Sequence, residues 1–106
     1  MGRNVDVSIV LPTYNEKENL EVIIPEIIRK LDAKKIDFEI LVVDDSSPDG
    51  TSEFIEYFGS EDPRVKLVLR KKKEGIGAAL RHGYDVAIGD IILSSDADQS
   101  FKIDDM

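Results

Sequence analysis

Two carboxylates near the end of the sequence have a spacing that suits a bound metal ion. Asp96 and Asp98 follow the apolar run 91–93 closely and are separated from each other only by Ala97. Alternate residues at the end of a strand can lie on either side of a cation, and carboxylate oxygens suit hard divalent cations. The pattern suggests a metal that holds phosphate groups, although acidic residues at strand ends more often form turns.

Polar clusters also follow three earlier apolar runs, and they occupy residues 12–16, 44–51 and 70–77. In an open parallel sheet, ligands bind beyond the carboxyl ends of the strands, so all four clusters would meet at one edge. Tyr14 either stacks on a flat base or packs against the protein. Asp44 and Asp45 are adjacent, so one can face a ligand while the other serves the backbone. Residues 49–51 are expected to start a helix.

The third cluster combines the basic run 70–73 with two glycines. The basic run is either a solvated turn or the source of one cation beside a diphosphate. Gly75 and Gly77 alone are a weak signal for a phosphate-binding turn, and Gly77 with Gly83 favours close packing of a helix on a sheet. His82, the single histidine, is expected to be a packing or surface residue and not a catalytic base.

The elements that must position these clusters alternate between strand and helix. Near-continuous apolar runs at 7–11, 38–43, 65–69 and 91–93 predict strands that are covered on both faces. Between them lie a helical stripe over 20–31, a second around 54–58 that would end at Gly59, and a third over 78–88 that would end at Gly89. This order predicts an α/β fold, a Rossmann-like three-layer α/β/α arrangement with a mainly parallel sheet.

Two details concern the first helix. Asn15 and Glu18 have the spacing of a capping box at its start. Pro25 lies inside the stripe and cannot donate a hydrogen bond to Glu21, so it is expected to kink the helix or to split it.

The composition excludes several classes of protein. The 106 residues suffice for one modest domain, no run approaches the ~20 apolar residues that span a bilayer, and no signal peptide is recognisable. The absence of cysteine excludes disulfides and thiolate metal sites, and it agrees with a cytoplasmic location. A net charge of −8 argues against a nucleic-acid partner, and a polyphosphate ligand would need a cation to offset the repulsion.

Four segments read together resemble a family 2 glycosyltransferase: Val-Ser-Ile-Val-Leu-Pro-Thr-Tyr-Asn-Glu (7–16), Val-Val-Asp-Asp-Ser-Ser-Pro-Asp-Gly-Thr (42–51), Gly-Ile-Gly-Ala-Ala-Leu-Arg-His-Gly (75–83) and Asp-Ala-Asp (96–98). The resemblance covers nearly the whole chain in the family's order and spacing. The segment 47–51 most resembles the branch that includes dolichol-phosphate mannosyltransferase and related polyprenyl-phosphate glycosyltransferases. The resemblance implies a GT-A fold, of which residues 1–106 form a single, truncated domain, the donor-binding half.

The resemblance also implies roles for individual residues. Pro12, Tyr14 and Glu16 would line the nucleoside pocket, and Asp45 would hydrogen-bond the base. Asp96 would lie near the ribose and the sugar phosphate. Arg81 or a basic residue within 70–73 would assist at the diphosphate.

The implied cofactor is Mg²⁺ or Mn²⁺. Asp98 would bind the ion that bridges the diphosphate. Some relatives place a glutamine two positions later, where it can join the metal shell. Here that position is Ser100, with Gln99 one residue earlier, so both are candidate metal ligands.

The implied reaction is metal-assisted, inverting transfer of a sugar such as mannose from a GDP- or UDP-sugar to an acceptor such as a polyprenyl or dolichyl phosphate. The catalytic residue is unknown and is expected to lie outside this chain, in the acceptor-binding segments with which relatives continue. We therefore expect the 106 residues alone to bind nucleotide weakly and to turn over slowly or not at all. The expected location is the cytoplasm, including the cytosolic face of a membrane.

Two other interpretations stay open from the sequence. One is a phosphoacceptor receiver domain, which is also acidic and α/β, although here the acidic pair follows the second strand and not the first. The other is a non-catalytic nucleotide-binding fragment that forms a homo-oligomer, because the fourth strand would have an unpaired edge.

Overall fold

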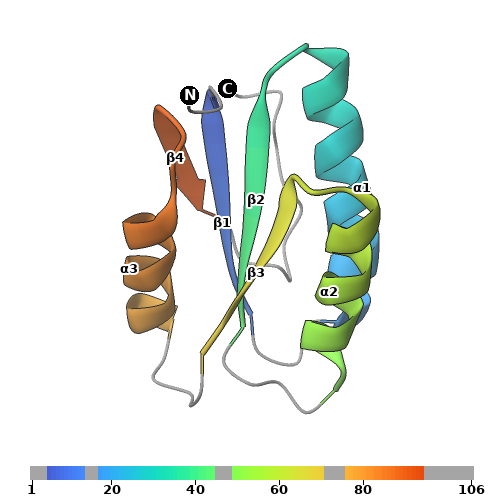
Figure 1. The fold of residues 1–106 in the computed structure, drawn as a ribbon, viewed down its shortest axis with the longest axis vertical. Coiled ribbons are helices and arrows are strands. Elements are labelled where there is room, and N and C mark those ends of the chain that lie inside the picture. The colour runs from blue at the N-terminus through green and yellow to red at the C-terminus, as the bar shows by residue number, and fades with distance from the viewer. Residues whose placement is uncertain (1–4, 14–16, 45–48, 71–75, 95–106) are drawn as a thin grey trace.

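The computed structural model describes residues 5–13, 17–44, 49–70 and 76–94 of the chain. Its elements are β1 (Val7–Thr13), α1 (Lys17–Ala33), β2 (Phe38–Asp44), α2 (Thr51–Glu61), β3 (Val65–Leu69), α3 (Ile76–Val86) and β4 (Ile91–Ser94). The described strands form one parallel sheet in the order β3-β2-β1-β4. Helices α1 and α2 cover one face and α3 covers the other (Figure 1). The predicted three-layer α/β fold is therefore confirmed.

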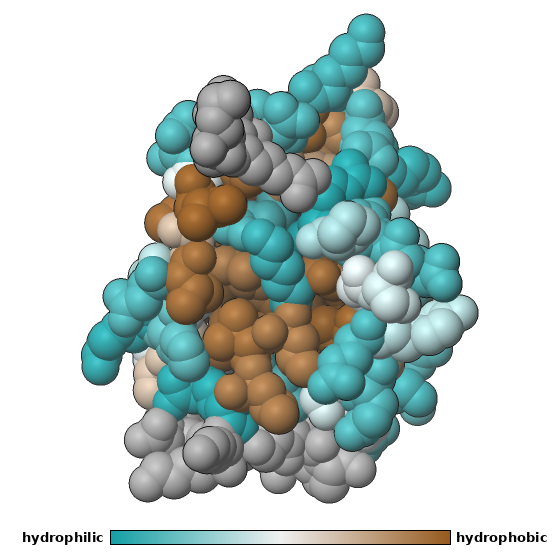
Figure 2. Space-filling model, viewed as in Figure 1, coloured by the Kyte–Doolittle hydropathy of each residue, from teal (hydrophilic) through white to brown (hydrophobic). Residues whose placement is uncertain are grey.

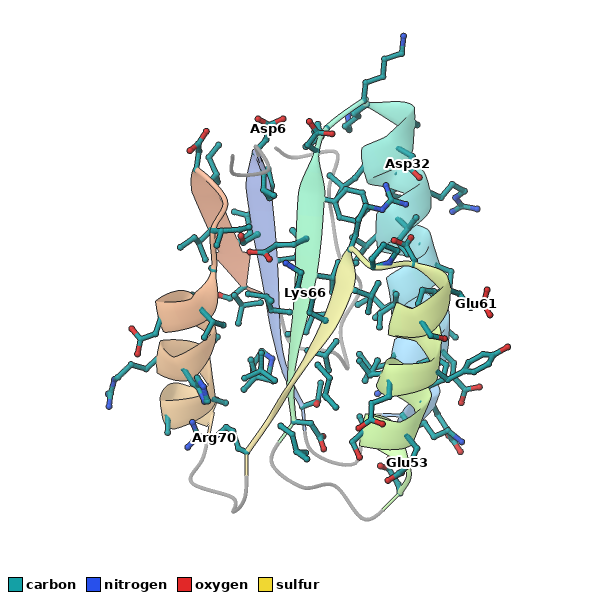
Figure 3. All side chains as sticks on the ribbon, in the orientation of Figure 1. Asp6, Asp32, Glu53, Glu61, Lys66 and Arg70 are labelled. Carbon is teal, nitrogen blue, oxygen red and sulfur yellow. The ribbon has the colours of Figure 1, made fainter. Side chains whose placement is uncertain are left out.

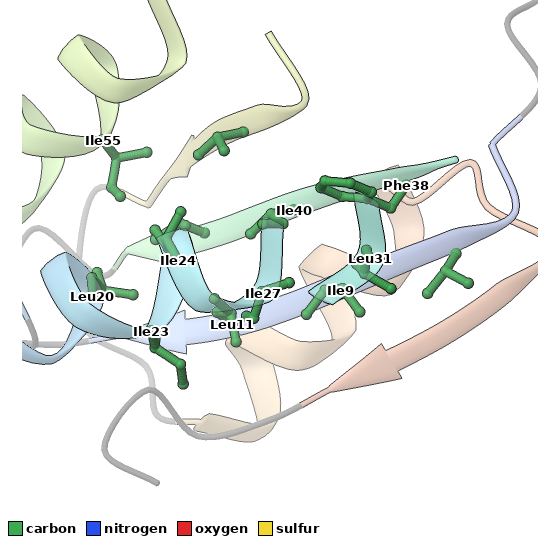
Figure 4. Packing of buried hydrophobic residues seen from close by; sticks show 13 residues of the cluster. Ile9, Leu11, Leu20, Ile23, Ile24, Ile27, Leu31, Phe38, Ile40 and Ile55 are labelled. Atoms are coloured by element: carbon green, nitrogen blue, oxygen red, sulfur yellow. The ribbon is translucent and has the colours of Figure 1, made fainter. Parts of the chain in front are cut away.

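Alternation along the strands divides the core into two parts. Every residue of β1 and β2 is buried, which explains why the sequence of these strands has no polar alternation. The larger cluster lies between the sheet and α1 with α2, and it includes Ile9, Leu11, Leu20, Ile24, Ile27, Leu31 and Ile40 (Figure 4). The smaller cluster lies under α3 and consists of Val10, Leu41, Val43 and Ala79, with Val68, Leu80 and Ala87 packed against it.

Helix α1 follows the predicted stripe, and it is not split. It runs continuously from Lys17 to Ala33 with Pro25 inside it, so of the two expected effects, a kink or a split, the split is wrong. Pro25 and Glu21 are both exposed. The carbonyl of Glu21, which loses its helical donor to the proline ring, therefore lies where water can bond it.

Two glycines that were expected to end helices instead allow backbones to approach each other. Helix α2 continues past Gly59 to Glu61, and a Cβ at Gly59 would lie 2.7 Å from the carbonyl oxygen of Val65. Helix α3 begins and ends two residues earlier than the predicted range 78–88. Gly89 lies in the turn after it, where a Cβ would be 2.6 Å from the backbone nitrogen of Ser8.

The amino ends of the strands are tied to the helices by one arginine. Arg64 lies between α2 and β3, and it forms ion pairs with Asp62 at 2.8 Å and with Asp32 of α1 at 2.7 Å. Its guanidinium also lies 4.5 Å from the centre of the Phe38 ring. Hydrogen bonds to Asp62 and Asp32 raise the pKa of Arg64. Arg64 therefore acts at the amino edge of the sheet, opposite the carboxyl edge to which the sequence assigns the polar clusters.

No helix in the described segments combines the length and the apolar character that a bilayer crossing requires.

Candidate functional site

The strand order creates a switch point at the carboxyl edge. The chain moves outward from β1 to β2 and β3 through α1 and α2 on one face, then returns through α3 on the other face to place β4 beside β1 (Figure 1). In open α/β sheets the ligand crevice forms at such a reversal, outside the carboxyl ends of the strands. The carboxyl ends of β1 and β4 are therefore where this fold can hold a ligand.

Pro12 lies beyond the last described pair between β1 and β4. That pair is Val10 with Ser94, whereas on the other side Pro12 is in register with Val43 of β2. Pro12 has no backbone N–H, so it cannot donate a hydrogen bond to either neighbouring strand.

Asp44 is held by a structural bond. It is fully buried, and its Oδ1 accepts a hydrogen bond from Thr13 Oγ1 at 3.0 Å, which joins the last residues of β1 and β2. Of the adjacent pair Asp44 and Asp45, Asp44 thus has a structural role. The nucleoside contact assigned to Asp45 stays a prediction, because Asp45 lies outside the described residues.

Asp49 joins the starts of two helices. Its Oδ1 accepts hydrogen bonds from Thr51 N at 3.1 Å and from Thr51 Oγ1, and its Oδ2 accepts one from Lys17 N at 3.1 Å. The predicted helix start at 49–51 is confirmed, with Gly50 in the left-handed region at φ 89°. Burial raises the pKa of Asp49, but the bonds from Thr51 and Lys17 outweigh it, so the pKa lies below its usual value.

The contact with Lys17 was not predicted. The expected capping box required Asn15, which lies outside the described residues, whereas the first N–H of α1 donates to Asp49, 32 residues away. No local pattern could have revealed this bond. Asp49 thus joins the start of α1 to the start of α2, the two helices that follow β1 and β2 in the sequence.

The basic residues near this edge have separate roles. Arg70 Nη1 donates to Ala78 O at 3.2 Å and lies 3.4 Å from His82 Nδ1, so Arg70 ties the end of β3 to α3. His82 is half-buried, which agrees with its expected packing role. Arg81 is exposed on α3, and Lys71 to Lys73 lie outside the described residues.

Two of the predicted site residues can be located in the structure. Pro12 is buried near the end of β1, and Arg81 is exposed on α3. The others, which are Tyr14, Glu16, Asp45, Asp96, Asp98, Gln99 and Ser100, lie outside the described residues. Within the described segments, no three histidine or acidic side chains are grouped as a metal site would require. The metal site at 98–100 therefore stays a prediction.

Comparison with known proteins identifies the family. The sequence model described as Glycosyl transferase family 2 matches residues 8–106. The chain belongs to glycosyl transferase family 2. The receiver interpretation is wrong, also because receiver domains have the order 2-1-3-4-5, whereas here β1 lies between β2 and β4.

Curated relatives of this family 2 chain are lipid-phosphate sugar transferases by name. It is 42% identical over 92 residues to a dolichol-phosphate mannosyltransferase of Pyrococcus furiosus, and the matched residues make up 87% of this chain and 25% of the relative. It is 37% identical over 101 residues to an undecaprenyl-phosphate mannosyltransferase of Micrococcus luteus, covering 88% of the chain and 38% of the relative. The chain thus spans between a quarter and two-fifths of these relatives.

Solved structures share the family 2 fold. A mannosyltransferase from Pyrobaculum calidifontis, in complex with GDP-Man and Mn²⁺, has a TM-score of 0.77 and 28% identity, covering 97% of this chain and 30% of that one. A mannosyl-3-phosphoglycerate synthase from Rubrobacter xylanophilus has a TM-score of 0.78 and 29% identity, covering 93% and 33%. The described sheet and helices are therefore those of the GT-A glycosyltransferases.

Proposed function

We propose that this chain binds the sugar donor of a family 2 glycosyltransferase that passes a hexose, mannose in the first instance, from a nucleoside diphosphate sugar to a polyprenyl phosphate. The observation that carries the proposal is the switch point between β1 and β4. Segments rich in carboxylates and hydroxyls follow β1, β2 and β4 at this edge, in the sequence order that the family requires.

The names of the relatives support the finer parts of the proposal. A similar structure is a mannosyltransferase solved with GDP-Man and Mn²⁺, which favours GDP over UDP as the nucleotide. Two relatives are named as mannosyltransferases of dolichol phosphate and undecaprenyl phosphate, which favours a lipid-phosphate acceptor. A protein that meets such an acceptor would work at the cytosolic face of a membrane.

The chemistry of the expected donor set fits a hard divalent cation. Asp98 with Gln99 or Ser100 offers carboxylate, amide and hydroxyl oxygens, the ligands that Mg²⁺ and Mn²⁺ take in proteins. When bound, the ion would stabilise the negative charge on the departing diphosphate.

The chain's own part is to bind and orient the donor. Tyr14 and Asp45 would fix the base, and Asp96 would fix the ribose and sugar phosphate. The oxygen of a lipid phosphate is already anionic, so an inverting attack on the sugar carbon makes small demands on a general base. The sugar–phosphate bond breaks as the new sugar–oxygen bond forms, and the nucleoside diphosphate leaves with the electron pair.

Calorimetric titration of the 106-residue chain tests the proposal. GDP and UDP would be titrated with and without Mn²⁺ into the wild-type chain and into Asp98→Ala. We expect Mn²⁺ to strengthen GDP binding by about tenfold or more, since even outer-shell changes cost 10–100-fold in metal affinity, and we expect Asp98→Ala to abolish that gain. Sugar transfer should be slow or absent.

Asp85→Ala is the matched control, because Asp85 is an exposed aspartate on α3 outside the predicted site. It should retain the effect of Mn²⁺. A GDP affinity that changes neither with Mn²⁺ nor with the Asp98→Ala substitution would contradict the metal assignment. Absence of nucleotide binding under all conditions would contradict the proposal that this segment forms the donor site unaided.

We also propose that the chain self-associates through its fourth strand. β4 is an edge strand of the described sheet, and Ile91 and Ile92 are 55% and 41% exposed. Ile88, in the turn before β4, is 55% exposed. An apolar edge strand favours pairing with a second chain.

A further inference from the structure

A buried carboxylate lies on the α3 face of the sheet, away from the predicted donor site. Glu39 of β2 is 2% exposed, although charged residues are almost never buried unless paired. Its Oε1 accepts a hydrogen bond from Lys66 Nζ at 2.9 Å, and its Oε2 accepts one from Ser8 Oγ at 2.6 Å. Figure 3 shows Lys66 reaching from β3 across the sheet. Glu39 therefore joins the three neighbouring strands β3, β2 and β1.

The same group of side chains reaches the turn between α3 and β4. Glu39 Oε2 also accepts a hydrogen bond from Ile88 N, and Ser8 Oγ accepts one from Gly89 N, both at 2.8 Å. The next backbone N–H groups, at 90–91, donate to carbonyls of the segment that leads into β1. Each backbone N–H from residue 88 to residue 91 thus has an acceptor on β2, on β1 or just before β1. For residues 88 and 89 that acceptor is a side chain.

The fit at this turn is close. A Cβ at Gly89 would lie 2.6 Å from Ser8 N and 2.7 Å from Ser8 Oγ. Real Cβ atoms do not approach other atoms so closely, so the turn backbone lies directly against β1. Burial raises the pKa of Glu39, but the bonds from Ser8, Ile88 and Lys66 outweigh it, and the pKa lies below its usual value. The carboxylate is therefore ionised when it accepts these bonds.

The side chains of β4 itself bury little surface that could set its register. Ile91 and Ile92 are 55% and 41% exposed, and Leu93 packs in part against the core. At the far end of the strand, Tyr84 Oη donates a hydrogen bond to Ser94 Oγ at 3.2 Å, but both side chains are exposed. Register is weakly specified in a strand that does not bury one face. A slip of one residue would shift β4 by about 3.3 Å along β1 and turn its side chains to the other face. Asp96 and Asp98 follow β4 in the sequence.

We propose that Glu39 and Ser8 are positioning residues that fix the register of β4 on β1, and so the point from which the segment that follows β4 in the sequence begins. The inference rests on the proposed function, because that segment carries the expected metal-binding carboxylates. The two side chains lie toward the amino ends of the strands and act through β4, without touching the donor. We call Glu39 and Ser8 the β4 latch.

Residue-resolved amide hydrogen exchange tests the β4 latch in the 106-residue chain. Ser8→Ala removes both hydroxyl bonds, whereas Glu39→Ala would remove the bonds to Lys66 and Ile88 as well and leave a cavity at a fully buried position. The readout is the ratio of exchange rates in β4 to those in β2. We expect Ser8→Ala to raise this ratio about tenfold, the size of effect that one lost hydrogen bond produces. Glu39→Gln keeps an acceptor oxygen and should raise it less.

Lys66→Met is the matched control. It removes the third partner of Glu39 but leaves the bonds to Ser8, Ile88 and Gly89 in place. It should lower global stability without changing the ratio. An unchanged ratio in Ser8→Ala, or an equal change in Lys66→Met, would overturn the inference.

Nucleotide binding supplies a second readout. Ser8→Ala should weaken GDP binding about tenfold in the presence of Mn²⁺ and leave binding without Mn²⁺ unchanged, because the latch acts on the metal-binding segment. An equal loss with and without Mn²⁺ would mean that the latch does not act through the metal carboxylates. If the wild-type chain shows no GDP binding, the proposed function fails, whereas the exchange ratio still decides the latch.

Discussion

At the scale of single residues, Asp49 holds the starts of two helices, α1 and α2, near the candidate site. The first N–H groups of a helix have no partner within the helix, and an anion at that end also favours the helix dipole. Asp49 meets this need for α1 and α2 at once. It therefore fixes how the starts of α1 and α2 lie relative to each other.

Replacing Asp49 should therefore weaken the fold. We expect Asp49→Ala to lower the free energy of unfolding by about 1–2 kcal/mol at pH 7, a cost similar to that of losing a helix N-cap, because the first N–H groups of α1 and α2 lose their side-chain acceptor. Urea denaturation followed by circular dichroism measures it. Glu56→Ala, at an exposed position of α2, is the control and should change stability by less than about 0.5 kcal/mol. Equal stability of the wild-type chain and Asp49→Ala would contradict the capping role.

The same carboxylate should make stability depend on pH. The folded-state pKa of Asp49 is lower than its usual value of 3.8, so the ionised form stabilises the fold above that pH. As pH falls through the folded-state pKa, this stabilisation is lost. The stability difference between the wild-type chain and Asp49→Ala should be constant from about pH 5 to pH 8 and shrink below about pH 4. A difference that persists unchanged at pH 3 would contradict the assignment.

At the scale of elements, the contact of α3 with the sheet depends on small residues. Ala79 is buried, and a Cβ at Gly83 would overlap Val10 Cγ1 and lie 3.2 Å from Val43 Cγ2. The predicted packing of this helix is thus confirmed at Gly83. It is wrong for Gly77, which is exposed and has nothing within 4 Å of its Cβ position.

The two glycines of α3 form a matched pair for mutation. Gly83→Ala should lower the free energy of unfolding by about 1–3 kcal/mol, because the methyl group overpacks the interface with β1 and β2. Gly77→Ala should raise it by up to about 1 kcal/mol through helix propensity alone. Denaturant midpoints at constant slope give both values. The same sign of change in both variants would contradict the packing described for α3.

At the scale of the whole molecule, apolar side chains are exposed on α3, on β4 and in the turn between them. Tyr84, Val86, Ile88, Ile91 and Ile92 are all at least 40% exposed. In Figure 2 hydrophobic surface extends from the upper left of the view down through its middle, between α3 and α2. Exposed apolar residues on an edge strand of the described sheet are the feature from which self-association is proposed.

Substitution on β4 should therefore change the oligomeric state. We expect the apparent mass of the wild-type chain in sizing chromatography to rise with concentration, and Ile92→Lys to keep it at the monomer mass, because a charge opposes edge pairing. Val22→Lys is the control, since Val22 is 69% exposed but lies on α1. It should behave like the wild-type chain. Monomeric wild-type protein at all concentrations would contradict the proposal.

The sequence by itself determined the elements and the edge at which chemistry gathers. The predicted strand 65–69 matches β3, and the other strands extend the predicted runs by one or two residues. Parallel strands buried on both faces need continuous apolar side chains, so each strand is encoded in its own residues. The polar clusters could be assigned to one edge for the same reason, since a parallel sheet brings all carboxyl ends together.

Only the tertiary structure decided the contacts that hold these elements in register. Glu39 occupies an apolar strand with no local sign of its partners, and its bonds reach Ser8 at a separation of 31 residues and Ile88 at 49. Glycine is the residue type expected at a helix end, but Gly59 and Gly89 instead lie against the backbone of Val65 and of Ser8. Such contacts depend on strand order and on the fit between layers, which residues close together in the sequence do not specify.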